Sequence, residues 1–182
     1  NGEGPLLVVM GGSQGAVGLN RMIRGVIPSL LQRGCRIVHI TGENDPSIGT
    51  FKHQNYVEKI FTNHISALLQ NADLAISRSG AGTICELLAC KCPSILIPFP
   101  FSADKHQDWN ASYAAEYGAA IILQESKSNF EPLEQSIQRL LRYKSTQNHS
   151  LFDCLGDMRK NINQLSIETG ETSLIKILED II

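Results

Sequence analysis

Six short apolar runs, separated by segments with helical periodicity, constrain the fold of this chain more than any other feature. The runs cover residues 6–10, 36–41, 56–57, 74–76, 94–97 and 119–123. The first run is apolar at every position, which is typical of a strand that is buried on both faces. Because strands alternate with helices, we predict an α/β fold: a Rossmann-like, doubly wound parallel sheet of about six strands with right-handed crossovers.

The predicted helices lie between these strands and after the last one. Residues 19–30 keep apolar side chains at helical spacing, and Gly34 ends that helix. A short helix over residues 65–71 has Asn63 as its predicted cap. Further helices are predicted over residues 83–89, 106–116, 130–143, 151–162 and 172–182.

The composition fits one globular domain and excludes several classes of protein. The 182 residues are 42% hydrophobic and 19% charged, which is enough to bury a substantial core. The net charge of −2 offers no basic surface, so we expect no nucleic-acid partner. No apolar run approaches the roughly 18–20 residues of a membrane-spanning helix. Five cysteines, without the spacing of a zinc site, indicate reduced thiols in a cytoplasmic protein.

The stretch from Ser77 to Glu86 predicts a phosphate-binding turn. It follows a buried strand, contains the small-residue sequence SRSGAG and leads into a helix that is predicted to begin at Thr83. Backbone N–H groups and the positive end of the helix dipole then face one point, where they can hold an anion. Thr83 can cap the helix or donate its hydroxyl to a phosphate. Glu86 lies one turn further on the same face, where its carboxylate can accept both hydroxyls of a ribose.

A second glycine-rich loop, GGSQGA at residues 11–16, follows the first strand. Neither loop has the glycine spacing of a dinucleotide-binding fingerprint, and the chain contains no P-loop motif. An NAD-dependent enzyme is therefore disfavoured. Because both loops follow parallel strands, they lie at the same edge of the sheet, and we predict that they bind one nucleotide together.

A third cluster, residues 104–110, is polar and leads into the helix over 106–116. His106 and Gln107 lie where a loop would overhang the ligand, and both can bond sugar hydroxyls. His106 could instead act as a general base, although no carboxylate partner is identifiable for it. The chain has no Asp-x-Asp pair, so we expect no metal and no cofactor. Helix N-termini and hydroxyls would then meet the charge of a leaving group.

In this order, the three clusters resemble the C-terminal half of the MurG family, the N-acetylglucosaminyltransferases of bacterial peptidoglycan synthesis, which have the GT-B fold. The resemblance runs from about residue 6 to residue 141, and the last two predicted helices match only in kind. It is carried by GGSQGA at 11–16, SRSGA at 77–81 with Thr83 and Glu86, Pro98 with Phe99, and His106-Gln107 with WNA at 109–111.

The resemblance implies five residues for the phosphate end of a UDP-N-acetylglucosamine donor. Gly12, Ser13 and Gln14 would contact the diphosphate. Gly82 and Thr83 would hold phosphate from the other side.

Four further residues are implied for the two ends of the donor. Thr62 would read the uracil through its backbone, and Glu86 would bind the ribose hydroxyls. His106 and Gln107 would hold the hydroxyls of the N-acetylglucosamine.

The resemblance also implies an activity. In the family, the C4 hydroxyl of undecaprenyl-diphospho-muramyl-pentapeptide (lipid I) attacks the anomeric carbon of the donor with inversion, UDP leaves and lipid II forms. In the family, the base, the acceptor site and the membrane contact belong to an N-terminal half, which the resemblance implies would lie outside this chain. We therefore expect no catalytic residue here and no transfer by this chain alone. The full-length enzyme would lie in the cytoplasm, peripheral on the cytoplasmic face of the bacterial inner membrane, and serve cell-wall biogenesis, cell shape and division.

The same comparison gives the expected domain organisation. Residues 1–5 look like an interdomain linker, and residues 6–182 would form the UDP-sugar-binding domain. The helices within residues 149–182 would contact the N-terminal domain.

Two alternatives remain open. The chain could belong to a related UDP-sugar:lipid glycosyltransferase that uses another donor, and His106 and Gln107 would then be the discriminating residues. It could also be a non-catalytic nucleotide-sugar-binding subunit that needs a separate partner chain.

Overall fold

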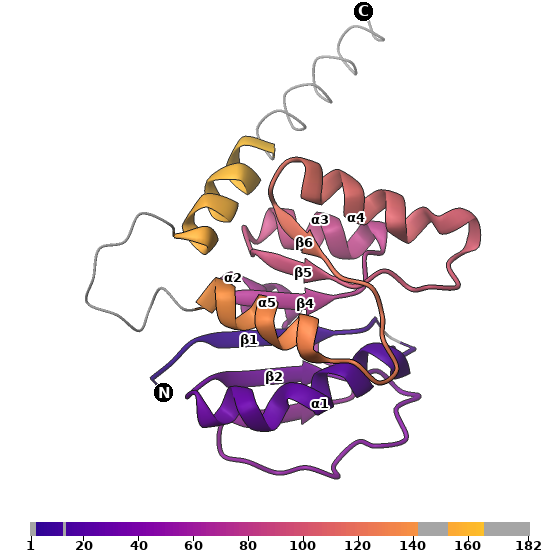
Figure 1. Cartoon of the computed structure of the whole chain (residues 1–182), viewed down its shortest axis with the longest axis vertical. Coiled ribbons are helices and arrows are strands. Elements are labelled where there is room, and N and C mark those ends of the chain that lie inside the picture. The colour runs from indigo at the N-terminus through magenta and orange to yellow at the C-terminus, as the bar shows by residue number, and fades with distance from the viewer. Residues whose placement is uncertain (1–2, 13, 142–152, 166–182) are drawn as a thin grey trace, which may run out of the picture.

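A six-stranded parallel sheet forms the centre of the molecule (Figure 1). The computed structural model describes residues 3–12, 14–141 and 153–165. The strands run in the order β3-β2-β1-β4-β5-β6, and all five pairings are parallel. They are β1 (Leu6–Met10), β2 (Arg36–Ile40), β3 (Tyr56–Lys59), β4 (Leu74–Ser77), β5 (Ser94–Leu96) and β6 (Ala120–Ile122). This arrangement confirms the predicted doubly wound sheet.

Helices cover both faces of the sheet. On one face lie α1 (Val17–Gln32) and α5 (Glu131–Leu141), and on the other lie α2 (Ile65–Asn71), α3 (Ala81–Ala89) and α4 (His106–Glu116). A 3₁₀ turn, Ala103–Lys105, precedes α4. A further helix covers residues 154–165, at the edge of the domain (Figure 1).

The two faces of the sheet build two hydrophobic cores because side chains alternate along each strand. Leu7 and Val9 of β1 pack toward α1 and α5, whereas Val8 and Met10 pack toward α2, α3 and α4. All of these strand residues are less than a tenth exposed. A strand that is buried on both faces must be apolar throughout, which explains the uninterrupted run LLVVM.

One predicted helix cap and one predicted helix start are wrong, although the predicted bounds of α2 (65–71) agree with the structure. The N-cap of α2 is His64 rather than Asn63, and its N–H donates to Thr62 Oγ1 at 3.1 Å. The N-cap of α3 is Gly80, so this helix begins two residues before Thr83, and no side chain caps it. By contrast, α1 ends as predicted, next to Gly34, whose φ of +81° favours glycine.

The helix at 154–165 packs onto the domain. Leu155, Met158, Ile162 and Leu165 are buried. Arg159 Nη2 donates to Ala72 O at 3.3 Å, two residues before β4. The predicted helix over 151–162 is therefore present with shifted ends, and the one over 172–182 lies outside the described residues. Within the part of the chain that the structure describes, no helix combines the length and apolarity that crossing a bilayer requires.

The strand order reverses between β1 and β4, and this reversal positions the site. From β1 the chain proceeds outward to β2 and β3, and it then returns to place β4 on the other side of β1. Met10 pairs with Ser77, so the two strands end side by side. In doubly wound sheets, the loops that leave such a point separate and open a crevice for ligands.

Candidate functional site

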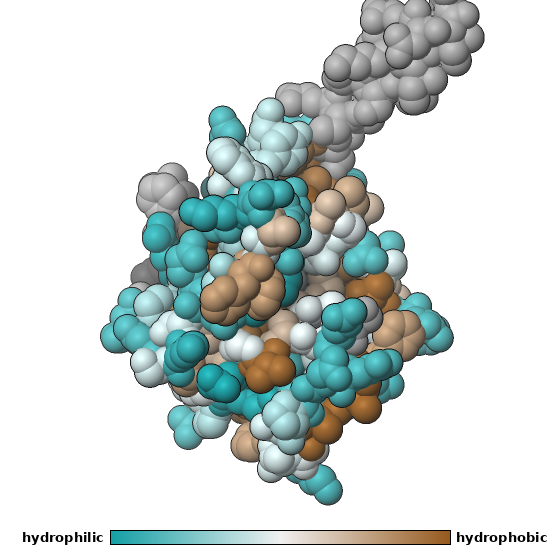
Figure 2. All heavy atoms as spheres, turned by 90° about the vertical axis from the view of Figure 1, so that its right-hand side faces the viewer, coloured by the Kyte–Doolittle hydropathy of each residue, from teal (hydrophilic) through white to brown (hydrophobic). Residues whose placement is uncertain are grey.

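A cleft of about 570 Å³ lies at the carboxyl ends of β1 and β4. Figure 2 shows this side of the molecule, where weakly polar residues lie among hydrophilic and apolar ones. Four segments line the cleft: the loop and first turn after β1, the loop and first turn after β4, the loop after β5 with the start of α4, and the segment after β6. Its lining residues are Gly11, Gly12, Gln14, Gly15, Ala16, Val17, Gly18, Arg78, Gly80, Thr83, Phe99, Gln107 and Glu125.

The loop after β1 aims the N-terminus of α1 at the cleft. Gly12 and Gly15 have φ of +87° and +88°, a region that side chains with a Cβ rarely adopt. The Gly15 N–H donates to Gly12 O at 3.1 Å and closes the turn. The N-cap Ala16 offers no side-chain acceptor, and the first turn of α1 contains no acidic residue. The positive end of the α1 dipole is therefore not neutralised by its own sequence.

The loop after β4 aims the N-terminus of α3 at the same cleft. Its N-cap, Gly80, is extended and makes no side-chain hydrogen bond. Thr83 lies in the first turn of α3, is half-buried and lines the cleft. Two helix N-termini without side-chain caps thus border one cleft, which is an arrangement that favours a bound anion.

Arg78 provides the positive side-chain charge of the cleft. Its Nη1 donates to Ile97 O at 3.0 Å and to Pro98 O at 3.1 Å, and Nη2 pairs with Glu125 Oε2. The guanidinium carbon lies 5.4 Å from the centre of the Phe99 ring, within the range of a cation–π contact. The Arg78 and Glu125 side chains are only 8% and 14% exposed.

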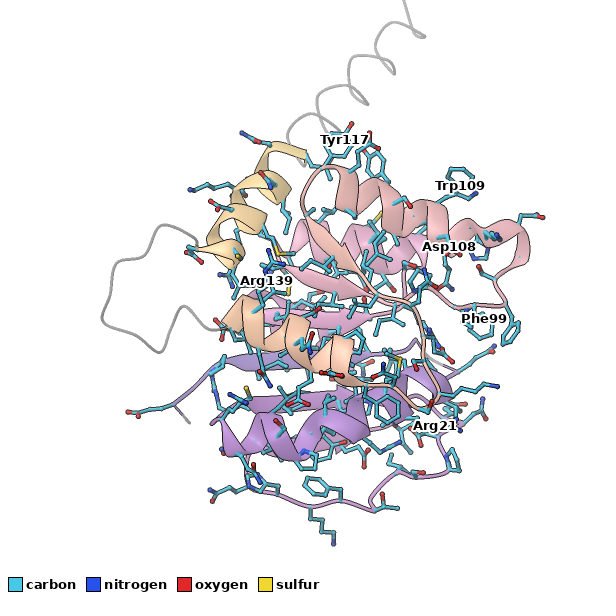
Figure 3. All side chains as sticks on the ribbon, viewed as in Figure 1. Arg21, Phe99, Asp108, Trp109, Tyr117 and Arg139 are labelled. Atoms are coloured by element: carbon cyan, nitrogen blue, oxygen red, sulfur yellow. The ribbon has the colours of Figure 1, made fainter. Side chains whose placement is uncertain are left out.

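Hydrogen bonds join the start of α4 to the loop after β4. Ser79 Oγ donates to Gln107 O at 2.7 Å, and Asn110 Nδ2 donates to Ser79 O at 2.9 Å. The Gln107 side chain accepts from the Phe99 N–H at 3.0 Å through Oε1. Figure 3 labels Phe99 with Asp108 and Trp109 of α4 on the side where the strands end. These contacts fix Gln107 at the rim of the cleft.

The structure brings four of the predicted site residues together in the cleft: Gly12, Gln14, Thr83 and Gln107. Ser13 lies outside the described residues. Four others do not line the cleft itself: Thr62, Gly82, Glu86 and His106.

These four outer residues surround the cleft on different elements. Gly82 and Glu86 are exposed on α3, and a Cβ at Gly82 would meet open space. Thr62 follows β3 and its hydroxyl is already bonded to the His64 N–H. His106 is exposed at the start of α4, with Nδ1 2.7 Å from Ala103 O.

Three cleft residues with charged or aromatic side chains received no role from the sequence: Arg78, Phe99 and Glu125. Arg78 and Phe99 stand in the motifs that carried the resemblance, and a charged residue directly after a buried strand is a signal that could have been used. Glu125 belongs to no motif. Its position became visible only when the fold placed the segment after β6 beside α1.

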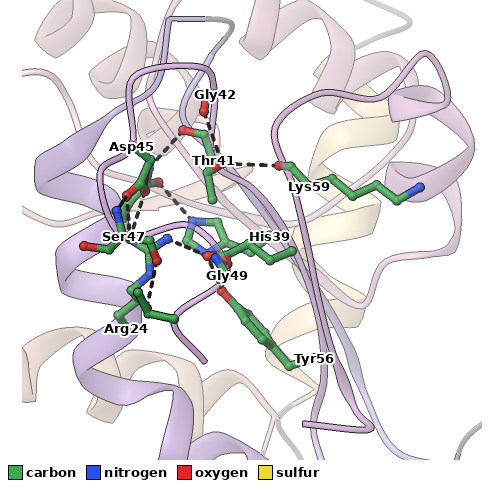
Figure 4. A network of polar contacts seen from close by, with 12 residues as sticks. Arg24, His39, Thr41, Gly42, Asp45, Ser47, Gly49, Tyr56 and Lys59 are labelled. Carbon is green, nitrogen blue, oxygen red and sulfur yellow. Dashed lines mark hydrogen bonds and ion pairs between the residues drawn. The ribbon is translucent and has the colours of Figure 1, made fainter. Parts of the chain in front are cut away.

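A buried polar network lies next to the cleft, between α1, β2 and β3 (Figure 4). Arg24 pairs with Asp45 at 2.8 Å and with Glu58 at 2.5 Å. His39 is fully buried, with Nδ1 2.9 Å from Tyr56 Oη and Nε2 2.9 Å from Asn20 Oδ1. Both ring nitrogens of this buried histidine therefore have a hydrogen-bond partner.

Burial and charge set the protonation states in this network. Burial, followed by the Arg24 charge, lowers the pKa of His39 to about 4, so the ring is neutral at pH 7. Burial opposes ionisation of Asp45 and Glu58. Backbone N–H donors (Ser47 and Gly49, respectively) and Arg24 nevertheless hold the pKa of both carboxyls below their usual range. The network fastens the loop after β2 to α1.

Comparison with protein families identifies the domain. The pattern of the glycosyltransferase family 28 C-terminal domain matches residues 6–165. A protein of Synechococcus sp. is 50% identical over 182 residues, which are all of this chain and 51% of that protein. A protein of Prochlorococcus marinus is 46% identical over 181 residues, with 50% of its length covered. Both are named UDP-N-acetylglucosamine–N-acetylmuramyl-(pentapeptide) pyrophosphoryl-undecaprenol N-acetylglucosamine transferase. The chain spans about half the length of these curated relatives.

Solved structures share the fold. The crystal structure of Acinetobacter baumannii MurG superimposes with a TM-score of 0.68 at 24% identity, over 90% of this chain and 46% of that one. The solution structure of ALG13 gives a TM-score of 0.56 at 17% identity, over 77% of this chain and 88% of that one. The structural neighbours are GT-B glycosyltransferases, which agrees with the predicted fold class.

Proposed function

The chain belongs to glycosyltransferase family 28, as its C-terminal domain, and on that premise we propose that it binds the UDP-N-acetylglucosamine donor of a peptidoglycan N-acetylglucosaminyltransferase. The transferase would move N-acetylglucosamine to the C4 hydroxyl of undecaprenyl-diphospho-muramyl-pentapeptide. The names of relatives at about half identity over the whole chain support this donor and acceptor.

One observation carries the proposal: the cleft is bordered by two helix N-termini that no side chain caps, with Arg78 between them. A diphosphate carries the charge that this arrangement favours. Gly12, Ser13 and Gln14 would contact it from the α1 side, and Gly82 and Thr83 from the α3 side. On departure of UDP, the same groups would stabilise the new negative charge.

The sugar end of the donor would lie at the start of α4. Because Gln107 Oε1 already accepts from the Phe99 N–H, its amide NH₂ is left to donate to a sugar hydroxyl. A neutral His106 that donates from Nδ1 to Ala103 O keeps Nε2 as an acceptor. One donor and one acceptor can then read neighbouring hydroxyls.

The uridine end would lie toward β3 and α3. Glu86 is exposed one turn beyond Thr83 and would accept the ribose hydroxyls. The Thr62 hydroxyl accepts from the His64 N–H, and recognition of the uracil would use the Thr62 backbone. The neighbouring Phe61 is 61% exposed and offers a ring on which a base can stack.

The remaining parts of the reaction would come from the half of the relatives that this chain does not cover. That half would supply the base, the acceptor site and a peripheral contact with the cytoplasmic face of the inner membrane. Helices within residues 149–182 would contact it. This chain alone would therefore bind the donor without transferring the sugar.

Calorimetric titration tests the proposal. We expect UDP and UDP-N-acetylglucosamine to bind, and UDP-galactose and NAD to bind more weakly or not at all. Glu86→Ala removes the acceptor of two ribose hydroxyls, so it should weaken UDP binding by roughly tenfold or more. Glu116→Ala is the matched control. It removes an exposed carboxylate from the C-terminal end of α4, the end opposite Gln107, and should leave binding unchanged. Binding of NAD alone, or no binding at millimolar donor, would contradict the proposal.

A second candidate is a donor-binding chain that works with a separate acceptor-binding chain. The ALG13 structure favours it, because this fold covers 88% of that chain and so occurs as a nearly complete polypeptide. Transfer that appears only when a separately produced N-terminal half is added would support this arrangement. Determining the coding sequence upstream of Asn1 would distinguish it from a single longer chain.

A further inference from the structure

We propose that Glu125 is an internal counter-anion of the cleft, which pairs with Arg78 when the cleft is empty and sets how tightly a diphosphate binds there. This inference rests on the proposed function and concerns the affinity of the same site. It assigns a role to a residue outside every motif that pointed to nucleotide binding.

The charged side chains of the cleft neutralise one another. Among its lining residues, Arg78 and Glu125 are the charged ones, and they form an ion pair through Arg78 Nη2 and Glu125 Oε2. Both side chains are less than a sixth exposed, so solvent screens them weakly. The side chains that line the cleft therefore sum to no net charge, although the backbone around them favours an anion.

The Glu125 carboxylate lies at the N-terminal end of α1. Glu125 Oε1 occupies the space that a Cβ at Gly18 would need, so the carboxylate lies against the first turn of α1. That turn contains no acidic residue, and no side chain caps it. Glu125, from the segment after β6, thus supplies the negative charge that the α1 dipole favours at this end. A diphosphate bound at the same helix end would meet this charge at short range.

The orientation of the Arg78 side chain does not depend on Glu125. Two carbonyl oxygens, of Ile97 and Pro98, accept from Nη1, and the Phe99 ring lies beside the guanidinium. These contacts hold the Arg78 guanidinium in place when the Glu125 carboxylate is absent. The contribution of Glu125 is then mainly its charge, which repels an anionic ligand.

The test compares UDP with uridine on wild-type chain and variants by calorimetry. Glu125→Gln keeps an oxygen for Arg78 and removes the charge, so we expect UDP to bind roughly three- to tenfold more tightly. Glu125→Ala removes the same charge without the amide and should act in the same direction. Uridine carries no phosphate, and its affinity should not change in either variant. Urea unfolding of each variant checks that it is folded.

Asp157→Asn is the matched control. It removes one carboxylate from an exposed position on the helix at 154–165, which packs near the start of β4, away from the cleft. Its UDP affinity should equal that of the wild type. UDP binding that is unchanged or weaker in both Glu125 variants would overturn this inference and leave the proposed function standing. If neither wild type nor variants bind UDP, the proposed function fails, and this inference fails with it.

Discussion

The Arg78 guanidinium lies between the carbonyl oxygens of Ile97 and Pro98 and the Glu125 carboxylate. Lysine keeps the positive charge, but its single ammonium group lacks the planar set of N–H donors that reaches all of these acceptors. We therefore expect Arg78→Lys to lower the free energy of unfolding by about 1–3 kcal/mol in urea titrations, because buried carbonyls lose their donor. Arg21→Lys, at an exposed position of α1 (Figure 3), is the control and should change stability by less than about 0.5 kcal/mol. Equal effects at both positions would show that the carbonyl contacts do not contribute.

Single residues also show where prediction from sequence ends. Gly12, Gln14, Thr83 and Gln107 line the cleft as expected. The loops that contain Gly12, Gln14 and Thr83 were predicted to meet because they follow parallel strands, whereas the roles of Gly12, Gln14 and Gln107 came from the family resemblance. The Arg78–Glu125 pair joins positions 47 residues apart. Nothing in either local sequence indicates the other residue, so this part of the cleft could not be predicted.

At the scale of a helix, replacing two glycines by alanine should change the stability of the protein in opposite directions. Gly82 of α3 faces open space, so Gly82→Ala should raise the free energy of unfolding by about 0.5–1 kcal/mol through reduced backbone entropy. Gly25 of α1 lies against the Phe130 ring, where a Cβ would overlap with Cδ2. Gly25→Ala should therefore destabilise the protein by about 1–3 kcal/mol despite the same gain in helix propensity. Urea unfolding measures both changes, and stabilisation by both would show that helix propensity outweighs the Phe130 contact.

Helix positions were predicted well where periodicity defines them and poorly where caps do. The bounds of α4 agree with the prediction, since a polar loop precedes it and Gly118 follows it. The predicted cap of α2 and the predicted start of α3 were wrong because Asn63 and Thr83 have capping chemistry that the backbone does not use. Geometry at Gly80 and His64, rather than a side-chain bond, begins these helices.

For the whole molecule, the alternation of strands and helices was sufficient to predict the doubly wound sheet. The strand order 3-2-1-4-5-6 is seen only in the structure, and its reversal between β1 and β4 places the cleft. The packing of the helix at 154–165 could not be predicted in the same way. Its contacts with Ala119 and with the carbonyl of Ala72 depend on tertiary structure.

The network around His39 predicts how stability of the whole molecule depends on pH. The folded state keeps this ring neutral down to about pH 4, whereas an unfolded histidine takes up a proton near pH 6.5. Below pH 6.5 the unfolded state therefore binds more protons, and stability is lost as the pH falls toward 4, by on the order of 3 kcal/mol from His39. Asp45 and Glu58, whose pKa values are lowered, add a further loss below about pH 4.

Urea unfolding at pH 7.5, 6.5, 5.5 and 4.5 measures this dependence. His39→Gln keeps hydrogen bonds to Tyr56 and Asn20 within reach and cannot take up a proton, so its stability should fall less steeply between pH 6.5 and 4.5. The exposed His53→Gln serves as the control and should follow the wild type. Parallel curves for wild type and His39→Gln would mean that the buried ring takes up its proton at the same pH in the folded and unfolded states. The acid sensitivity of the domain would then come from its carboxylates, because Asp45 and Glu58 hold the loop after β2 only while they are ionised.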